Sequence, residues 1–519
     1  MIRVKNLGVL LALALALGTI SASLHAQEKD AKPADKPAEA APVPAKEESS
    51  ITDHTIKLGG QTIPYKATAA TILIKNEKDE PTALIYYTAY TRSDAKDLSQ
   101  RPVSFVYNGG PGSSSVWLHM GSFSPRRVIT TNAESTPPAP YKLVENANCL
   151  LDKTDLVFID PVGTGFSHAV GKAQDKDFWG VDQDVKSLAQ FIATYVSRNS
   201  RWNSPKFLIG ESYGTFRSAA LSNYLQSHDG MYFNGIVLIS SVLDLGTISF
   251  NAGEDMPYIF YLPSYAATAW YHKVLKDRPE NLNAFLEETR KFSQTDYADA
   301  LMKGSKLGDA EKSAVAKKLS RYTGLSEDYL VKANLRVNLP QFMKELQRAR
   351  GLTTGRLDAR FSGWTYDLLG EYAEYDPQDT SITGPFTAVF NNYVRDELKF
   401  GQDKVYHTGA DEAGQNWDWK HRGGGDNFGF PGSPNVEGDL IQALLTNPHL
   451  QVEVENGIYD LATPFFATEY TMEHLGLPDK LQKNIHLQYY DAGHMMYLRD
   501  EDLAKLKANI ASFIDSASK

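Results

Sequence analysis

The stretch of sequence that decides the fold is Phe207-Leu208-Ile209-Gly210-Glu211-Ser212-Tyr213-Gly214, which is followed by a helix-compatible run over residues 215–225. A short apolar run, a G-x-S-x-G turn and a helix form the context of a nucleophile elbow, a strained turn that lifts a serine hydroxyl above the end of a sheet. The flanking glycines leave room for that turn. Ser212 is placed there to attack a carbonyl carbon, while the backbone N–H of Tyr213 helps to hold the oxyanion. Because G-x-S-x-G also occurs by chance, this interpretation needs partners elsewhere in the chain.

The partners expected downstream of the serine are an acid and then a histidine. The chain has 12 histidines, and we favour His494, which lies in a Gly-containing loop just after the strand-like run 485–490. His119, near a second Gly-rich loop, is the next choice. The acid is expected after the strand-like run 451–454, where Asp460 lies in the following loop. Its carboxylate would fix the tautomer of the histidine and stabilise the imidazolium.

A second motif follows the buried-strand run 103–107 and reads Asn108-Gly109-Gly110-Pro111-Gly112-Ser113-Ser114-Ser115. A Gly-Gly-Pro-Gly loop after a strand presents bare backbone N–H groups to a ligand. In a fold with a nucleophile elbow, the loop after this early strand supplies the other oxyanion donor. An ordinary turn is the alternative. A phosphate-binding loop is set aside because no Gly-Lys-Ser/Thr follows.

Together these motifs resemble those of the serine carboxypeptidases. Five stretches match in the order typical of that family: the Asn108 loop, Asp160-Pro161-Val162-Gly163-Thr164-Gly165-Phe166-Ser167, the Ser212 pentapeptide, the Asp460 loop and Ala492-Gly493-His494-Met495. They span most of the chain and leave unmatched only the N-terminal 1–50 and a middle insertion. The resemblance implies an α/β-hydrolase fold, with a mostly parallel central sheet flanked by helices and a helical cap.

The resemblance also implies a role for each matched position. The roles are Ser212 as nucleophile, His494 as general base and acid, Asp460 as the residue that orients it, Gly110 and Tyr213 as backbone oxyanion donors, and Asn108, Gly109 and Glu211 as the site for the substrate's terminal carboxylate. Two adjacent carboxylates cannot both be ionised without strong repulsion. Glu211 is therefore expected to be protonated when a peptide binds, which predicts best binding at acidic pH. The alternative is that Glu211 is a structural hydrogen-bond partner of nearby backbone.

Two positions depart from the family's pattern. Ser113 stands where the family commonly has Cys, and no acid lies near Ser122, where the family commonly has a second Glu. The acidic pair is thus incomplete, and the mode of carboxylate capture need not follow the family. Arg126 and Arg127 follow closely and are candidates for a compensating positive charge, or simply surface arginines.

The order of the remaining runs predicts the domain organisation. Thr55–Leu58, Ile63–Tyr65, Ala70–Lys75 and Ala83–Tyr90 read as antiparallel strands. Strand–helix alternation then indicates a parallel sheet with helices on both faces. From 250 to 363 charged amphipathic stretches dominate with no apolar strand run, which predicts a helical cap insertion. The hydrolase core is then expected over 51–249 and 364–519.

The N-terminus has the pattern of a secretory signal over residues 1–26, with Arg3 and Lys5 before the apolar run 7–17 and small residues near Ala26. Residues 27–50 are rich in Ala, Pro, Lys and Glu, which predicts a disordered tether. The single cysteine, Cys149, rules out an intrachain disulfide. An exported protein without disulfides fits a bacterial periplasm or exterior better than a eukaryotic vacuole.

Composition narrows the choice of partners. The formal net charge of -10 argues against nucleic acid, because no basic surplus exists to neutralise phosphates. No His/Cys spacing suggests a metal, and no cofactor is expected. The Gly- and Trp-rich stretch 409–434 is long for a loop and either lines the pocket or forms irregular surface. The oligomeric state is left open.

The function predicted from these observations is that of an exported serine-type carboxypeptidase acting on peptides with a free C-terminus. An esterase or lipase would share the triad but would not need Glu211 or Asn108. An acyltransferase of the same fold would differ in excluding water. A non-enzymatic binding protein is disfavoured because the set of catalytic residues is complete.

Overall fold

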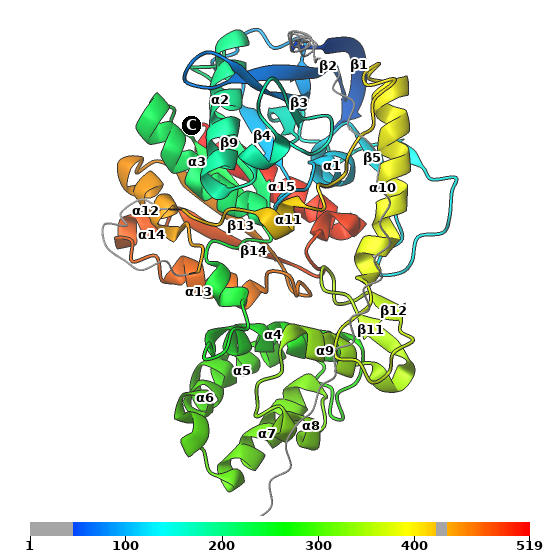
Figure 1. The fold of residues 1–519 in the computed structure, drawn as a ribbon, viewed down its shortest axis with the longest axis vertical. Coiled ribbons are helices and arrows are strands. Elements are labelled where there is room, and N and C mark those ends of the chain that lie inside the picture. The colour runs from blue at the N-terminus through cyan, green and yellow to red at the C-terminus, as the bar shows by residue number, and fades with distance from the viewer. Residues whose placement is uncertain (1–44, 422–432) are drawn as a thin grey trace, which may run out of the picture. The chain divides into compact units, whose positions relative to one another are not determined.

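The structure, a computed structural model, describes residues 45–421 and 433–519. Within them the centre is a ten-stranded mixed sheet (Figure 1). Its inner strands run parallel, whereas the first strands and their partners pair antiparallel. In spatial order the strands are β1 (Ser49–Leu58), β2 (Gln61–Lys75), β3 (Pro81–Arg92), β7 (Asp155–Ile159), β4 (Val103–Tyr107), β9 (Lys206–Glu211), β10 (Gly235–Ile239), β13 (Gln451–Gly457) and β14 (Ile485–Tyr490), with β8 (His168–Ala169) beside β3.

The central strands are buried along almost their whole length because helices cover both faces of the sheet. Successive side chains point to opposite faces, so Phe105 and Tyr107 of β4 pack into one hydrophobic cluster and Val106 packs into the other. The first cluster includes residues of α2 (Val181–Arg198), α3 (Tyr213–Asp229) and α12 (Glu437–Thr446). The second includes residues of α1 (Val116–Leu118), α10 (Pro377–Asp396) and α15 (Asp500–Ala517). The predicted sheet flanked by helices is confirmed.

The outer strands differ in detail from their expected bounds. The runs at Ile63–Tyr65 and Ala70–Lys75 belong to one strand, β2, because β1 and β3 pair with it on both sides. Strand β1 also begins at Ser49, inside the expected tether. Glu47 accepts a hydrogen bond from the backbone N–H of Leu73 and pairs with Arg198 at 2.8 Å. Glu47, a charged residue of the segment whose composition predicts disorder, therefore forms an ion pair in the structure. Residues 1–44, which include the expected signal segment, lie outside the described residues.

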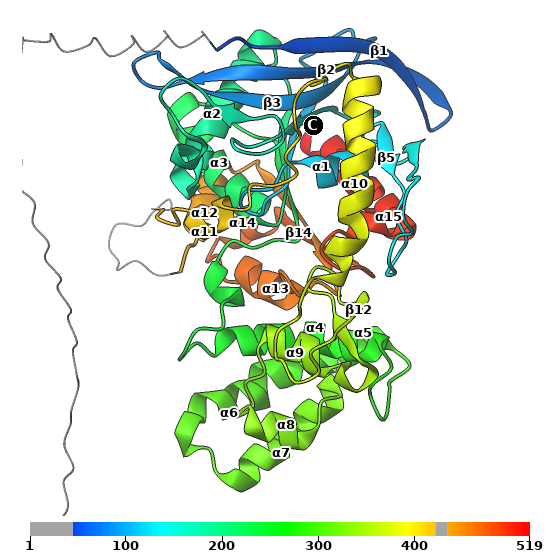
Figure 2. The ribbon, with the colours of Figure 1, turned by 45° about the vertical axis from the view of Figure 1, so that its right-hand side comes forward.

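The insertion forms a helical group of its own, which lies to one side of the sheet in Figures 1 and 2. Its helices are α4 (Met256–Tyr271), α5 (Leu282–Phe292), α6 (Ala298–Lys303), α7 (Asp309–Thr323), α8 (Glu327–Lys332) and α9 (Leu339–Glu345). A two-stranded hairpin, β11 (Leu352–Thr354) with β12 (Ser362–Trp364), ends it, whereas the sequence indicates no strand there. Across the described ranges, no helix is both long and apolar enough to cross a bilayer.

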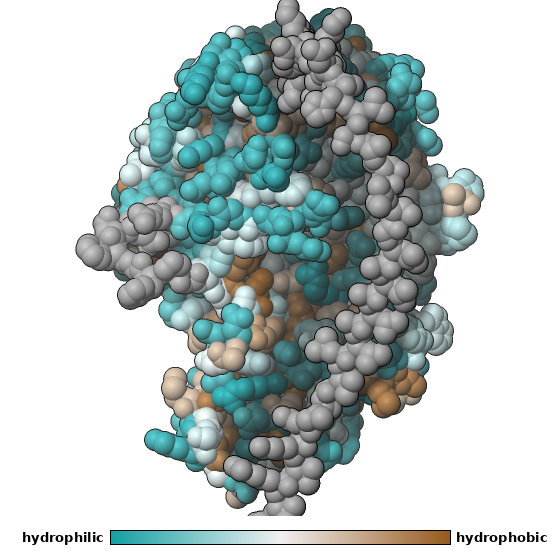
Figure 3. Space-filling model, in the orientation of Figure 1, coloured by the Kyte–Doolittle hydropathy of each residue, from teal (hydrophilic) through white to brown (hydrophobic). Residues whose placement is uncertain are grey.

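The insertion shares its hydrophobic core with the sheet domain. Tyr459 and Leu461, which flank Asp460, belong to the same buried cluster as Phe260, Phe342 and Leu319 of the insertion. Figure 3 shows hydrophobic residues gathered between the mainly hydrophilic sheet domain and the insertion on the face viewed in Figure 1. The loop that carries the predicted acid is thus supported from both sides.

Candidate active site

Ser212 lies at the sharp turn between β9 and α3. Its φ of 59° is in the left-handed region, which is a strained conformation for a residue with a side chain. The flanking glycines are needed because the chain nearly touches itself: a Cβ on Gly210 would lie 2.2 Å from the carbonyl oxygen of Gly214. The backbone N–H of Ser212 is bonded to Ile239 O at 2.9 Å. The geometry is therefore that of a nucleophile elbow.

His494 and Asp460 are brought together from the loops after β14 and β13. His494 Nδ1 lies 2.7 Å from Asp460 Oδ2, and both side chains are buried. The other carboxylate oxygen, Oδ1, accepts the N–H groups of Ala462 and Thr463 at 2.7 and 2.9 Å, so its orientation is fixed. Burial lowers the pKa of His494, but the carboxyl groups of Asp460 and Glu211 together more than offset this and leave the pKa raised. The pair is arranged to hold a proton on the imidazole.

The two predicted oxyanion donors are adjacent because the Asn108 loop packs directly on the elbow. A Cβ on Gly109 would lie 2.4 Å from the backbone nitrogen of Tyr213, so only glycine fits there. Gly110 has a φ of 104°, a conformation that side chains rarely adopt. Tyr213 is the first residue of α3, and N–H groups in the first turn of a helix have no partner within it. Both N–H groups are thus available for an anion.

Glu211, the last residue of β9, is buried beside Asn108. Asn108 Nδ2 donates a hydrogen bond to Glu211 Oε1 at 2.8 Å, and Asn108 Oδ1 accepts the N–H of Leu118 at 2.9 Å. Burial raises the pKa of Glu211 to about 7. The Asn108 carbonyl in turn accepts Nη1 of Arg217 at 2.6 Å, and that arginine pairs with Asp184. A buried polar chain therefore runs from the helices behind the sheet to Glu211.

These residues open onto one cleft of about 600 Å³. Of the predicted site residues, Asn108, Gly109, Gly110, Glu211, Ser212 and His494 line it. Asp460 stands behind His494. Lining residues that the sequence analysis did not indicate are Trp117, Arg356, Leu357, Asp379 and Thr383, with the segment 406–408.

A short segment at the end of the insertion, residues 356–359, connects the loops that carry Asp460 and His494. Leu357 O accepts the backbone N–H of His494 at 2.6 Å, and Asp358 Oδ2 accepts that of Gly493 at 3.0 Å. On the other side, the N–H of Leu461 is bonded to Arg356 O at 3.0 Å, and the N–H of Ala359 to Tyr459 O at 2.9 Å. The insertion thus contributes directly to the alignment of Asp460 and His494.

Of the stretch 409–434, the structure describes residues 409–421 and 433–434. Its first residues line the cleft, and Trp417 and Trp419 pack edge-on against Tyr213. His421 lies between two carboxylates, with Nδ1 2.6 Å from Asp182 and Nε2 2.8 Å from Asp439. Burial lowers the pKa of His421, but the two carboxylates raise it to about 8 overall. Residues 422–432 lie outside the described residues.

The alternative residues weighed from sequence lie elsewhere. His119 is buried against Phe158, with Nε2 2.7 Å from Tyr90 OH, and it does not line the cleft. Arg126 pairs with Glu397 at 2.6 Å and Arg127 with Asp500 at 2.5 Å, so neither charge is directed at the cleft. In the described part of the chain, no group of three or more His, Cys, Asp or Glu side chains is arranged to hold a metal ion.

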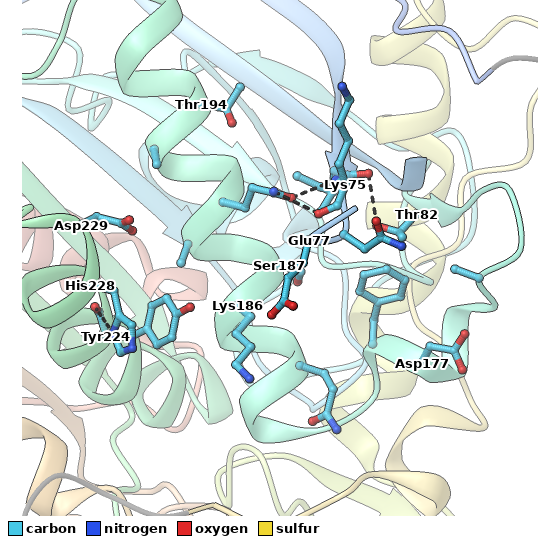
Figure 4. Close-up of a pocket in the computed structure, with 18 of the residues that line it drawn as sticks. Lys75, Glu77, Thr82, Asp177, Lys186, Ser187, Thr194, Tyr224, His228 and Asp229 are labelled. Carbon is cyan, nitrogen blue, oxygen red and sulfur yellow. Dashed lines mark hydrogen bonds between the residues drawn. The ribbon is translucent and has the colours of Figure 1, made fainter. Parts of the chain in front are cut away.

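A larger hollow, of about 1340 Å³, lies between the β2–β3 turn and helices α2 and α3. Figure 4 shows its polar lining, with Lys75, Lys186 and Asp177 spread around it and His228 beside Tyr224. None of the predicted catalytic residues borders this hollow. The larger cavity is therefore not the one at which the predicted site residues meet.

Comparison with known proteins identifies the family. The sequence profile of the family described as serine carboxypeptidase matches residues 63–502, and the chain belongs to that family. A solved structure of KEX1, a prohormone-processing carboxypeptidase from Saccharomyces cerevisiae, superposes with a TM-score of 0.55 at 18% identity, covering 87% of this chain and 91% of that one. The α/β-hydrolase fold expected from the sequence is confirmed.

Two curated relatives show how far the sequence similarity extends. The pheromone-processing carboxypeptidase KEX1 of Saccharomyces cerevisiae is 29% identical over 161 residues, which are 30% of this chain and 21% of the yeast protein. Serine carboxypeptidase-like 34 of Arabidopsis thaliana is 25% identical over 398 residues, which are 73% of this chain and 69% of the plant protein. The match thus spans about a fifth of the yeast relative's length.

Proposed function

We propose that the protein is a serine-type carboxypeptidase that removes the C-terminal residue of peptides with a free carboxylate. The observation that carries this proposal is the buried Glu211 next to Ser212, held by Asn108 at 2.8 Å within the cleft of the triad. A general esterase has no use for a carboxyl group there. Because burial raises the pKa of Glu211 to about 7, a protonated Glu211 can share its proton with a substrate carboxylate.

The reaction follows from the arrangement of the triad. Ser212 Oγ attacks the carbonyl carbon of the last peptide bond while His494 Nε2 takes the hydroxyl proton. The N–H groups of Gly110 and Tyr213 stabilise the tetrahedral oxyanion. His494 then returns the proton to the leaving amine, and the terminal amino acid departs. Water attacks the acyl-enzyme with His494 again as base, which frees the shortened peptide and restores Ser212. Asp460 holds the imidazole in position throughout.

Export belongs to the proposal as well. The basic start, the apolar run and the small residues over 1–26 have the pattern of a cleaved secretory signal. With one cysteine in the chain, a bacterial periplasm or exterior is the compartment proposed. Expression in a bacterial host, followed by fractionation and N-terminal sequencing, tests this: a mature chain starting near Gln27 outside the cytoplasm supports export, and an intact Met1 in the cytoplasm contradicts it.

The first experiment is release of free amino acid from N-blocked dipeptides, compared with the same dipeptides carrying a C-terminal amide, between pH 4 and pH 8. The proposal predicts cleavage of the free acids and little cleavage of the amides. Ser212→Ala is the control, and it should abolish turnover because it removes the nucleophile. Equal cleavage of acids and amides, or activity on simple esters alone, would move the function to an esterase or endopeptidase.

A further inference from the structure

Glu211 has one carboxyl oxygen that lacks a partner. Asn108 satisfies Oε1, but Oε2 is buried and no described residue donates a hydrogen bond of good geometry to it. The hydroxyl of Tyr497 is likewise buried, and it makes no hydrogen bond of good geometry within the described residues. Unpaired buried polar atoms are rare because each costs the desolvation of the group. Here the two atoms are complementary, since one is an acceptor and the other a donor.

The two groups are close neighbours. Burial raises the pKa of Tyr497, and the Glu211 carboxyl raises it further, with Asn108 also within reach of the phenol. The other charged groups that act on Glu211 are His494, which lowers its pKa, and Asp460, which raises it. Besides the Asn108 amide, which is already bonded to Oε1, the phenol is thus the neutral donor beside this carboxyl.

The position of Tyr497 is built into the fold. It lies three residues after His494, in the short 3₁₀ turn Met496–Leu498, and its side chain is about 1% exposed. Its ring rests on Gly121, where a Cβ would lie 2.7 Å from the ring atom Cε2. Gly121 belongs to a π-helical turn over His119–Phe123, a rare local structure that often accompanies functional sites. A glycine in that turn makes room for the tyrosine.

No second carboxyl supports Glu211 from this turn. Ser122 lies near the position at which the resemblance leads one to expect an acid, and its hydroxyl donates to Leu118 O at 2.5 Å. The helical turn that would carry the acid therefore offers Glu211 no hydrogen bond.

We propose that Tyr497 is a positioning residue, whose hydroxyl donates to Glu211 Oε2 and directs the carboxyl at the terminal carboxylate of the peptide. This inference rests on the proposed carboxypeptidase function and adds the residue that replaces the missing acid. A phenol and a carboxyl have opposite effects on Glu211: a second carboxylate would raise its pKa by repulsion, whereas a donated hydrogen bond favours the ionised form and lowers it. Tyr497 thereby sets the upper pH limit of peptide binding.

The test is Tyr497→Phe, which keeps the ring on Gly121 and removes only the hydroxyl. Steady-state rates are measured from pH 4 to pH 9 on blocked dipeptides as free acids and as amides. Without the phenol, the pKa of Glu211 rises, so the alkaline fall of kcat/KM for free acids should move up by about one pH unit. Below pH 6, where Glu211 is protonated in both proteins, KM for free acids should rise by about threefold to tenfold with kcat within twofold.

Tyr265→Phe is the matched control, because Tyr265 OH is also buried without a partner but lies in α4 of the insertion. It should reproduce the wild-type pH profile, and thermal unfolding of both variants reports their folding. If Tyr497→Phe is folded and its free-acid profile superimposes on that of the wild type, the role of Tyr497 is wrong while the carboxypeptidase function stands. If the wild type itself does not prefer free acids to amides, both proposals fall.

Discussion

The Arg217–Asp184 pair behind the active site offers a sharp test of the buried polar chain. Arg217 is fully buried, with Nε 2.6 Å from Asp184 Oδ2 and Nη1 donating to Asn108 O at 2.6 Å. In the described part of the chain, it is the only side chain that donates a hydrogen bond to the Asp184 carboxylate. Arg217→Met leaves that carboxylate buried and unpaired, so the free energy of unfolding should fall by about 3–5 kcal/mol.

Urea unfolding followed by tryptophan fluorescence measures this loss. The matched control is Arg321→Met, because Arg321 and Glu288 form a pair at 2.5 Å whose side chains are about half exposed. That change should cost less than about 1 kcal/mol. The double variant Arg217→Met/Asp184→Leu should be more stable than Arg217→Met alone, because it removes the stranded charge. The reasoning is refuted if the free energy of unfolding of Arg217→Met lies within about 1 kcal/mol of that of the wild type. It is also refuted if Arg217→Met/Asp184→Leu is less stable than Arg217→Met.

Three further predictions concern the cleft and its supports. Glu211→Gln should remove the fall in kcat/KM for free-acid peptides above pH 7, because the group with a pKa of about 7 is gone; a persisting fall would assign that pKa to another group. Gly109→Ala should lower kcat/KM by at least about 100-fold, because its Cβ would meet the Tyr213 nitrogen at 2.4 Å and displace an oxyanion donor. Gly409→Ala, whose Cβ would make an ordinary contact at 3.4 Å in the same cleft, is its control and should stay within a few-fold of the wild type. The pKa of His421 in the folded protein is raised to about 8, so its contribution of about 2 kcal/mol to the free energy of unfolding is complete below pH 6.5 and is lost as pH rises through 8. The difference in unfolding free energy between the wild type and His421→Asn should therefore shrink by that amount from pH 6 to pH 9. An unchanged difference would show that the two carboxylates do not stabilise the imidazolium.

The predictable part of the site is the part that local chemistry dictates. A nucleophile elbow needs glycines within a few residues of Ser212, and the Asn108 loop needs Gly109 to approach Tyr213, so both leave a pattern in the sequence. Strand β4 is recognisable for the same kind of reason, because the short run Val103–Tyr107 consists mostly of β-branched and aromatic residues and is followed at once by a Gly-rich turn. Such features depend on neighbours along the chain.

The unpredicted part depends on contacts between distant segments. Tyr497 follows His494 by three residues, yet nothing local shows that its ring turns toward Gly121 and Glu211. The hairpin β11–β12 was missed because three-residue strands carry no measurable periodicity. Asp379 and Thr383 lie in a long amphipathic helix, where a residue that lines a cleft cannot be told from one facing solvent without the packing of that helix.

The four bonded residues at the end of the insertion have a consequence for protein engineering. Cap domains invite exchange between relatives as a route to new specificity, and the obvious cut points here are the ends of the helical region. Residues 356–359 hydrogen-bond to the loops of both Asp460 and His494. A graft that replaces them therefore removes the hydrogen bonds that align the histidine, even when the sheet folds. A graft that ends before residue 356 leaves the hydrogen bonds of residues 356–359 as they are in the recipient. The boundary suited to exchange therefore lies inside the helical insertion and not at its end.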